Sequence, residues 1–323
     1  MKLSQLSGIA ALAFGFAAAP ALGAGYPERP VNIIVPFAAG GPTDAVARIL
    51  AQSLQKQSGG SFLVENVPGA GTTIGAARAA RAQPDGYTLF WGSSSSLAIA
   101  PHIYSKIAYD PLNSFDPVSW VASTPYVMVV RPDSPAKTIA DLVARAKAAP
   151  GKMNYASAGL GSGPHVVAEM FLNAAGISIQ HIPYKGGSPA ITAVISGDVD
   201  FYFDTPTTPI PLVKANRLRA LAVTDTARQA ELPDVPTMQE SGLSGVEAHA
   251  WFALLAPHGT PKEIVNQLNK MVAVALKDPA VLEQMAKGSF NPASSTPEKL
   301  GQTIKAEHER WGKIIREKNI RVD

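Results

Sequence analysis

The stretch VPFAAGGPTDAVARIL, Val35–Leu50, contains the pattern on which the fold prediction rests. It joins the end of an apolar, β-branched run to a glycine turn. Pro42 then begins a segment in which apolar residues recur every three or four positions, as in a helix. A helix N-terminus presents unpaired N–H groups and a partial positive charge, and glycines let an anion approach the main chain. The turn lacks the lysine of a P-loop, so ATP or GTP binding is not expected.

Short strand-like runs of the same kind recur along the chain, with helical patterns between most of them. They are 31–35, 62–66, 87–91, 126–130, 153–157, 177–182, 199–203, 218–223 and 251–256. Strand–helix alternation over this length predicts an α/β fold with largely parallel sheets.

The last sixty or so residues predict consecutive helices over 261–276, 279–287 and 297–318. Several helix starts combine a capping side chain with a proline at the next position. The predicted capping residues are Thr138, Ser188, Thr260, Asp278 and Thr296.

Composition excludes several classes of protein. The chain has 323 residues, 46% of them hydrophobic and 16% charged, with a formal net charge of +3. No run of lysine or arginine concentrates this charge, so nucleic acid is not an expected partner. Cysteine is absent, which excludes cysteine nucleophiles and thiolate metal sites. Neither a metal nor a cofactor is expected.

Residues 1–25 have the features of a secretory signal peptide. Lys2 precedes an uncharged run of apolar and small residues, and small residues surround the end of that run. Pro20 and the glycines interrupt it well short of the ~20 residues that a membrane span needs. The mature chain is therefore expected to start near Tyr26 and to be exported.

Three further glycine-rich junctions follow strand-like runs: VPGAGTTIGAARAARA (67–82), NYASAGLGSGPHVVAEMF (154–171) and IPYKGGSPAI (182–191). The first is one residue longer than the dinucleotide fingerprint and has no acidic residue at the expected place, so nicotinamide binding is not supported. In open α/β sheets, ligands bind where strand C-terminal ends meet helix N-termini. Two junctions lie early and two lie mid-chain, which predicts two domains that face each other across a cleft.

No set of catalytic residues stands out. The G-x-S-x-G and H-E-x-x-H motifs are absent, and His165 with Glu169 makes a poor metal site by itself. Asp204 ends an apolar run, where it is placed to face a ligand. The alternative that stays open is an exported α/β hydrolase or transferase that uses His165 or Asp204.

The order and spacing of these motifs resemble those of the Bug/TctC family, the periplasmic solute receptors of tripartite tricarboxylate transporters. The resemblance rests on segments such as YPERPVNIIVPFAAGGPTDAVAR, VENVPGAGTTIGAA, QPDGYTLFWGSSSS and HIPYKGGSPAITAVISGDVDFYFD, and it extends from Tyr26 to the C-terminal helices. It implies a type II periplasmic-binding-protein fold, with two α/β domains joined by two crossing strands around a ligand cleft. The implied divisions are a signal peptide at 1–25, domain I at 26–124 plus 249–323, and domain II at 125–248.

The resemblance also implies the binding residues, because family members hold carboxylates through main-chain N–H groups of domain I with help from domain II. Carried onto this chain, they are Phe37, Ala38, Ala39, Gly40, Gly41, Thr43, Ala70, Gly71, Thr72, Ser93, Ser94, Ser95, Ser157, Ala158, Gly159, Ser162, His165, Tyr184 and Asp204.

The function implied is that of a non-enzymatic periplasmic receptor, expected to act as a monomer. It would deliver a small carboxylate to membrane transporter subunits or to a sensor. The ligand stays open among dicarboxylates, tricarboxylates, amino acids and aromatic acids. Four aromatic residues either flank the cleft or belong to the core: Phe37, Trp91, Tyr184 and Trp251.

Overall fold

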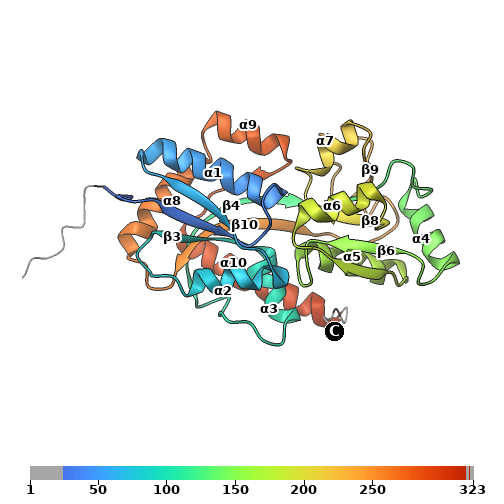
Figure 1. The fold of residues 1–323 in the computed structure, drawn as a ribbon, viewed down its shortest axis with the longest axis horizontal. Coiled ribbons are helices and arrows are strands. Elements are labelled where there is room, and N and C mark those ends of the chain that lie inside the picture. Colours follow the sequence, from blue (N-terminus) through green and yellow to red (C-terminus); the bar gives the residue numbers. More distant parts are fainter. Residues whose placement is uncertain (1–24, 318–319, 321–323) are drawn as a thin grey trace, which may run out of the picture.

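The computed structural model describes residues 25–317 and residue 320. The predicted signal peptide lies outside the described residues except for Gly25. The described chain forms two lobes that lie along the long axis of the molecule (Figure 1). No helix in the described part combines the length and the apolar character needed to cross a bilayer.

The first lobe is built on a six-stranded sheet with the order β11-β4-β10-β3-β1-β2. Its strands are β1 (Val31–Val35), β2 (Phe62–Asn66), β3 (Thr88–Ser93), β4 (Phe115–Pro125), β10 (His249–Pro257) and β11 (Asn291–Pro292). Its helices are α1 (Pro42–Ser58), η1 (Ala70–Thr72), α2 (Thr73–Ala80), the π-helical η2 (Ser95–Ile99), α3 (Ala100–Ile103), α8 (Lys262–Ala275), α9 (Pro279–Lys287) and α10 (Pro297–Glu317).

The second lobe is built on a five-stranded sheet with the order β7-β6-β8-β5-β9. Its strands are β5 (Val127–Val130), β6 (Asn154–Ser157), β7 (Gln180–Pro183), β8 (Phe201–Asp204) and β9 (Arg219–Val223). Its helices are α4 (Ile139–Ala148), α5 (Gly163–Ala175), α6 (Gly187–Ser196) and α7 (Pro209–Lys214).

The prediction of largely parallel sheets is wrong for the strands near the lobe junction. Helical crossovers make β1 parallel to β2 and β3, and β6 parallel to β7 and β8. Strands β4 and β10 instead carry the chain out of the first lobe and back into it, so they pair antiparallel from His249 opposite Pro125 to Pro257 opposite Phe115. Strand β5 is likewise antiparallel to β8 and β9.

The two crossings between the lobes share one hydrogen-bonded residue, Thr224. Its hydroxyl oxygen accepts the N–H of Tyr126, which lies between β4 and β5, at 2.9 Å. The same hydroxyl donates to the carbonyl of Ala248, immediately before β10, at 2.6 Å. Thr224 is fully buried, so this link is shielded from water.

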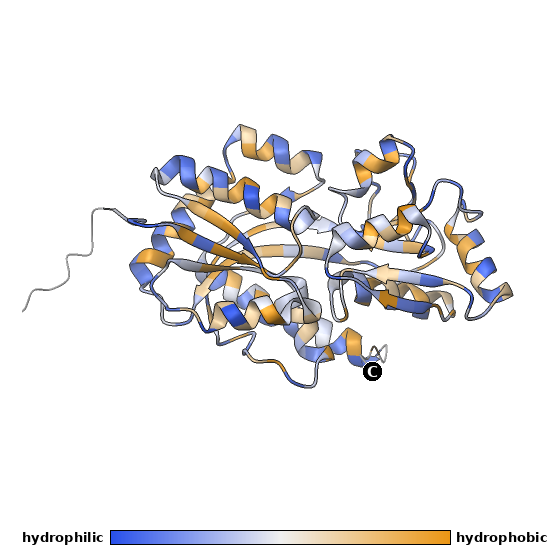
Figure 2. Cartoon of the chain, viewed as in Figure 1, coloured by the Kyte–Doolittle hydropathy of each residue, from blue (hydrophilic) through white to orange (hydrophobic). Residues whose placement is uncertain are grey.

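Apolar residues gather in the strands and on the inner faces of the helices (Figure 2). The stripe predicted on helix α1 consists of Val46, Ile49, Leu50 and Leu54. It is confirmed at Val46, Leu50 and Leu54, which have no exposed surface, whereas Ile49 is only partly buried. Two of the four aromatic residues in question belong to the core: Trp91 is fully buried, and Trp251 stacks on Trp120 with ring centroids 5.3 Å apart.

The helix-start predictions are confirmed at three capping residues and wrong at two. The side chains of Thr138, Asp278 and Thr296 accept N–H groups of their own helices. Thr260 instead donates to a carbonyl three residues before it, and α8 begins at Lys262. Helix α6 begins before Ser188, whose hydroxyl therefore points to the turn of the other lobe.

We expect replacement of Glu307 by leucine to lower the free energy of unfolding by about 2 kcal/mol, because it leaves buried donors unpaired. One carboxylate oxygen of Glu307 accepts both the Trp251 indole N–H at 3.1 Å and the Trp311 indole N–H at 3.2 Å. Glu307→Gln keeps an acceptor and should lose clearly less. Urea unfolding followed by tryptophan fluorescence measures both; equal losses in the two variants would show that these hydrogen bonds contribute little.

Candidate functional site

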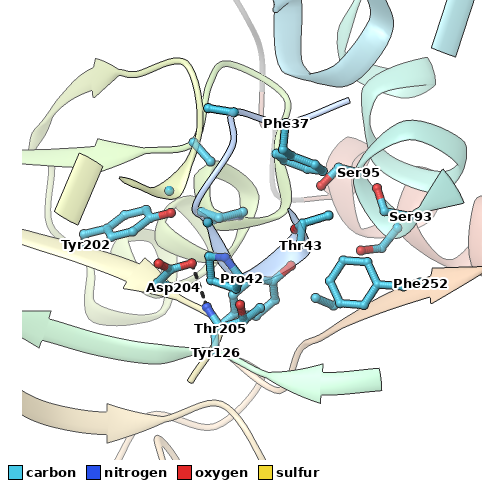
Figure 3. Close-up of a pocket in the computed structure, with 17 residues that line it drawn as sticks. Phe37, Pro42, Thr43, Ser93, Ser95, Tyr126, Tyr202, Asp204, Thr205 and Phe252 are labelled. Carbon is cyan, nitrogen blue, oxygen red and sulfur yellow. Dashed lines mark hydrogen bonds between the residues drawn. The ribbon is translucent and has the colours of Figure 1, made fainter. Parts of the chain in front are cut away.

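A small cavity of about 30 Å³ lies where the two lobes meet (Figure 3). We call it the Asp204 cavity. The first lobe contributes the turn between β1 and α1, the end of β3, and two residues of β10. The second lobe contributes the starts of α5 and α6 and the end of β8.

Three helix N-termini converge on this cavity, since Pro42 of α1, Pro164 of α5 and Gly187 of α6 all line it. Each N-terminus carries partial positive charge and N–H groups that the helix itself does not use. Hydroxyl side chains also line the cavity: Thr43, Ser93, Ser94, Ser95, Tyr126, Tyr202 and Thr205. Among the described residues, Asp204 is the only charged one in the lining. The wall therefore offers donors and dipoles but no lysine or arginine.

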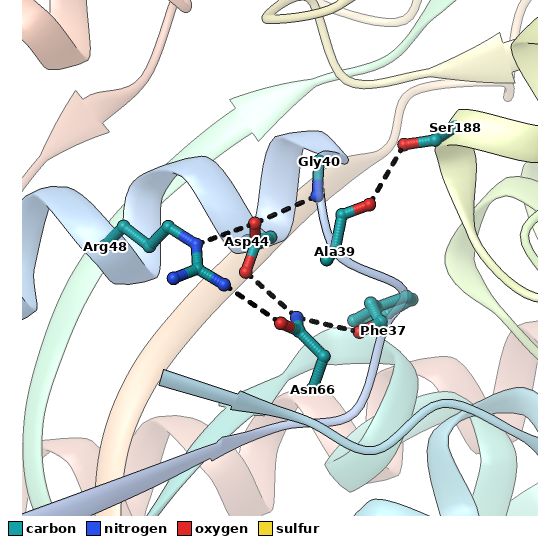
Figure 4. Close-up of polar contacts among 7 residues, drawn as sticks. All are labelled: Phe37, Ala39, Gly40, Asp44, Arg48, Asn66 and Ser188. Carbon is teal, nitrogen blue, oxygen red and sulfur yellow. Dashed lines mark hydrogen bonds and ion pairs between the residues drawn. The ribbon is translucent and has the colours of Figure 1, made fainter. Parts of the chain in front are cut away.

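The turn between β1 and α1 is held by the buried side chain of Asp44 (Figure 4). One carboxylate oxygen accepts the Gly40 N–H and the Arg48 Nε, each at 2.9 Å, and the other accepts the Asn66 amide at 2.9 Å. The Asn66 amide also donates to the Phe37 carbonyl at 3.0 Å. Burial alone would raise the pKa of Asp44, but the hydrogen bonds from Arg48, Gly40 and Asn66 outweigh it and lower that pKa.

On the opposite wall, strand β8 places Tyr202 and Asp204 on one face, because they lie two residues apart. Asp204 is 4% exposed, and its Oδ1 accepts the Thr205 N–H at 2.9 Å. Its Oδ2 and the Tyr202 hydroxyl are buried without a hydrogen-bond partner. Burial raises the pKa of Asp204 to about 8, against the opposing effects of the Thr205 N–H and of the neighbouring Tyr202 hydroxyl.

A second cavity of about 210 Å³ adjoins the first and shares Phe37 and Ala158 with it. We call it the Gly71 cavity. It lies between the turn that follows β2 and the loop that follows β6. Tyr104 of the first lobe donates to the Leu160 carbonyl of the second at 2.8 Å.

Further contacts close the gap between the lobes. The Ser95 hydroxyl of the first lobe accepts the Gly163 N–H at the start of α5, at 2.9 Å. Ser188, in the first turn of α6, donates to the Ala39 carbonyl at 3.4 Å. The lobes therefore touch on both sides of the Asp204 cavity, which is the geometry of a closed cleft.

Most of the residues assigned to the site from the sequence line one of the two cavities. The Asp204 cavity includes Phe37, Ala38, Gly41, Thr43, Ser93, Ser94, Ser95, Ala158 and Asp204. The Gly71 cavity includes Phe37, Ala70, Gly71, Thr72, Ala158, Gly159 and Tyr184. The other five line neither: Ala39, Gly40, Ser157, Ser162 and His165. The binding role of every one of these residues stays a prediction.

Three of those five lie behind the loop that follows β6. The Ser157 hydroxyl is 2.6 Å from His181 Nε2, and the Ser162 hydroxyl donates to the Gly159 carbonyl at 2.6 Å. His165 stacks on His181 with ring centroids 4.3 Å apart, and its Nδ1 accepts the Gly161 N–H at 3.3 Å. Burial lowers the pKa of His165 to about 3, with a smaller effect of His181, and burial lowers that of His181 to about 4.

Sequence reasoning missed several lining residues, including Tyr126, Tyr202 and Phe252. A signal existed for Tyr202, because strand alternation puts it on the same face as Asp204. The described residues contain no cluster of three or more His, Cys, Asp or Glu side chains that could hold a metal ion.

A family model described as the tripartite tricarboxylate transporter family receptor matches residues 46–320. The chain belongs to this receptor family. Protein BugT of Bordetella pertussis is 38% identical over 93% of this chain and 92% of its own length.

Two solved structures are similar to this receptor over most of both chains. "R. palustris Rpa4515 with adipate" has a TM-score of 0.89 and 34% identity, with 92% of this chain and all of the other covered. MatC of Rhodopseudomonas palustris with bound malate has a TM-score of 0.85 and 32% identity, with 90% and 99% covered. The type II periplasmic-binding-protein fold expected from the sequence is thereby confirmed.

We expect Gly71→Ala to hold the lobes apart. Gly71 has φ +57°, and a Cβ there would lie 1.8 Å from the Leu160 carbonyl oxygen of the other lobe. Gly59→Ala is the matched control, because Gly59 has φ +72° but nothing within 4 Å of its Cβ position. Both variants bear a backbone cost of about 1 kcal/mol. Small-angle scattering should show a larger radius of gyration only for Gly71→Ala; identical profiles would contradict the close approach.

The stability of the receptor should fall as the pH drops below 6.5. Above that pH, His165 and His181 are neutral in both the folded and the unfolded protein. Below it the unfolded chain binds a proton at each histidine, whereas the folded chain does so only near pH 4 at His181 and near pH 3 at His165. His165→Gln does not titrate, so the difference in unfolding free energy between pH 7 and pH 5 should shrink by up to about 2 kcal/mol. Urea unfolding at both pH values tests this; an unchanged difference would mean that His165 titrates alike in both states.

Proposed function

We propose that this receptor closes on a small carboxylate in the periplasm and delivers it to a tripartite tricarboxylate-type membrane transporter, without catalysing a reaction. One observation carries the proposal. In the described residues, five buried side-chain nitrogen or oxygen atoms lack a hydrogen-bond partner, and four of them belong to residues that line the two cavities: Thr72, Tyr202, Asp204 and Thr205. Buried polar atoms are normally paired, so their concentration in the cleft supports a polar ligand there.

The electrostatics of the Asp204 cavity support an anionic ligand. Three helix N-termini point at one space, and main-chain donors in a water-poor cleft can hold a carboxylate without a cation. Two similar receptors whose structures contain adipate and malate support a ligand with two carboxylates.

Domain closure would supply the mechanism of capture. We propose the boundaries 26–124 plus 249–323 for domain I and 125–248 for domain II, supported by the strand membership of the two sheets. Bending would occur where β4 passes into β5 and where the chain enters β10. Ligand contacts from both lobes would then favour the closed population. Export by the signal peptide at 1–25 and action as a monomer belong to the same proposal.

Of the two residues named for the hydrolase or transferase alternative, Asp204 lines the cavity between the lobes and His165 does not. His165 lines neither cavity, and its Nδ1 is engaged by the Gly161 N–H. Ser157 does contact an imidazole, that of His181, but it has no exposed surface. Incubation of the receptor with a bound carboxylate or its ester, followed by mass spectrometry, would return both unchanged; a hydrolysed ester would revive the alternative.

We expect Gly41→Asp to weaken adipate binding about 100-fold more than Gly41→Asn, through repulsion between like charges at short range. Gly41 has φ −87° and ψ 171°, which any residue adopts, and its Cβ would meet no atom closer than 3.7 Å. The two substitutions therefore differ in charge and hardly in size. Titration calorimetry with adipate measures the difference. Equal adipate affinities in the two variants would show that no ligand carboxylate binds at this turn.

A further inference from the structure

The two ends of the Asp204 cavity differ in chemistry. In Figure 3, Ser93, Ser95 and Phe252 lie at one end, and the carboxyl group of Asp204 lies with the Tyr202 hydroxyl at the other. The first end offers neutral hydroxyls. The second end holds a carboxyl group, which by itself would repel an anion.

The carboxyl group of Asp204 is only half satisfied by the protein. Its Oδ1 accepts the Thr205 N–H, whereas Oδ2 has no hydrogen-bond partner and is buried. Oδ2 and the Tyr202 hydroxyl lie beside the same glycine: a Cβ on Gly187 would be 3.2 Å from Oδ2 and 3.4 Å from the hydroxyl oxygen. Two unpaired oxygen atoms thus flank one spot at the start of α6, which also lines the cavity.

Among the residues that the structure describes, no cation compensates Asp204 from an element packed against β8. On β8 and before β5, the titratable neighbours are the tyrosines Tyr202 and Tyr126, whose pKa values burial raises. Helix α6 has no titratable side chain. The remaining titratable groups of β6, α5 and the start of α1 are engaged elsewhere: Tyr155 with Glu169, His165 with His181, and Asp44 with Arg48.

We propose that Asp204 acts in its protonated form and donates its hydrogen to the second carboxylate of a dicarboxylate ligand, with the Tyr202 hydroxyl as a second donor. The inference rests on the proposed function, in which the turn of the first lobe holds the first carboxylate. It adds that binding of a dicarboxylate requires one proton on the protein.

An ionised carboxylate that is buried without a cation is strongly destabilised, and a proton removes that destabilisation. Burial raises the pKa of Asp204 to about 8, so the group is mainly protonated at neutral pH. A ligand carboxylate nearby raises that pKa further, because two like charges disfavour each other. The O–H donated to an ionised carboxylate is then a strong, charge-assisted hydrogen bond.

The competing occupant of this end is a ligand ammonium group, which would ionise Asp204 and pair with it. Matched ligands separate the two. Adipate, 6-aminohexanoate and hexanoate share one chain and differ only at the far end, and the corresponding four- and five-carbon triads cover shorter ligands. Titration calorimetry of the wild-type receptor should give the highest affinity for the dicarboxylate of a triad at pH 7 and the lowest for the amino acid.

The pH dependence has a definite sign. Dicarboxylate affinity should fall about tenfold between pH 7 and pH 9 as Asp204 loses its proton, given its pKa of about 8. Affinity for the matched monocarboxylate should depend on pH much less, because it places no charge at that end. The far carboxylate is already ionised throughout this range, so ligand titration does not contribute.

Two substitutions at Asp204 complete the test. Asp204→Asn presents an N–H donor at every pH, so its dicarboxylate affinity should stay level from pH 7 to pH 9 and exceed that of the wild type at pH 9. Asp204→Leu presents no donor and should bind the dicarboxylate more weakly than Asp204→Asn at both pH values.

Two results would overturn the proposal while leaving the receptor function intact: a wild-type dicarboxylate affinity that stays level to pH 9, or a preference for the amino acid of a triad that Asp204→Asn abolishes. The second result would assign Asp204 to a ligand ammonium. A wild-type receptor that binds no member of any triad would instead overturn both the carboxylate function and this inference.

Discussion

The geometry of the cleft depends on one buried carboxylate, that of Asp44. Its two oxygens collect donors from the glycine turn, from helix α1 and from the end of β2, and thereby fix three segments of the first lobe relative to one another. A turn that presents main-chain N–H groups to a ligand is useful only if it is rigid before the ligand arrives. Asp44 fixes the turn by accepting the Gly40 N–H. Gly41 and Thr43, the neighbouring residues of the turn and the helix start, line the cavity.

The charge distribution around the cleft follows from the same arrangement. Arg48, one helical turn after Asp44, is engaged with Asp44 and Asn66 and does not line the cavity. The Asp204 cavity therefore has helix dipoles and hydroxyls as its positive elements and one carboxyl group as its exception. In our proposal, a proton on that carboxyl group would remove its negative charge and so allow an acidic side chain to face an anionic ligand.

Much of the fold could be predicted from the sequence, because the runs that form the strands are short, β-branched and separated by amphipathic segments. Strand β4 was missed as a full strand, since Pro117 and the polar residues of Phe115–Pro125 break its apolar pattern. Pro117 lies opposite Leu255 at an irregularity of the β4–β10 pairing, where a missing N–H is tolerated. The mixed strand directions also depend on how two distant crossings pair, which no local pattern reveals.

The site could be predicted at the level of junctions but not of individual side chains. The turns after β1, β2 and β6 do line the cleft, as the strand–glycine–helix patterns indicated. Whether a side chain faces the cavity or the core depends on long-range packing. Ser157 and His165 turn inward because His181, from the neighbouring strand β7, offers a hydrogen bond to one and a stacking surface to the other. Phe37 and Tyr184 line cavities, whereas Trp91 and Trp251 are core residues.

The single hydroxyl of Thr224, bonded to Tyr126 on one crossing and to Ala248 on the other, ties the two hinge points together. Neither strand can flex independently without breaking a bond that water cannot replace. In the domain closure that we propose, this link would couple the two crossings, so that a membrane partner bound to one lobe would sense whether the other has closed.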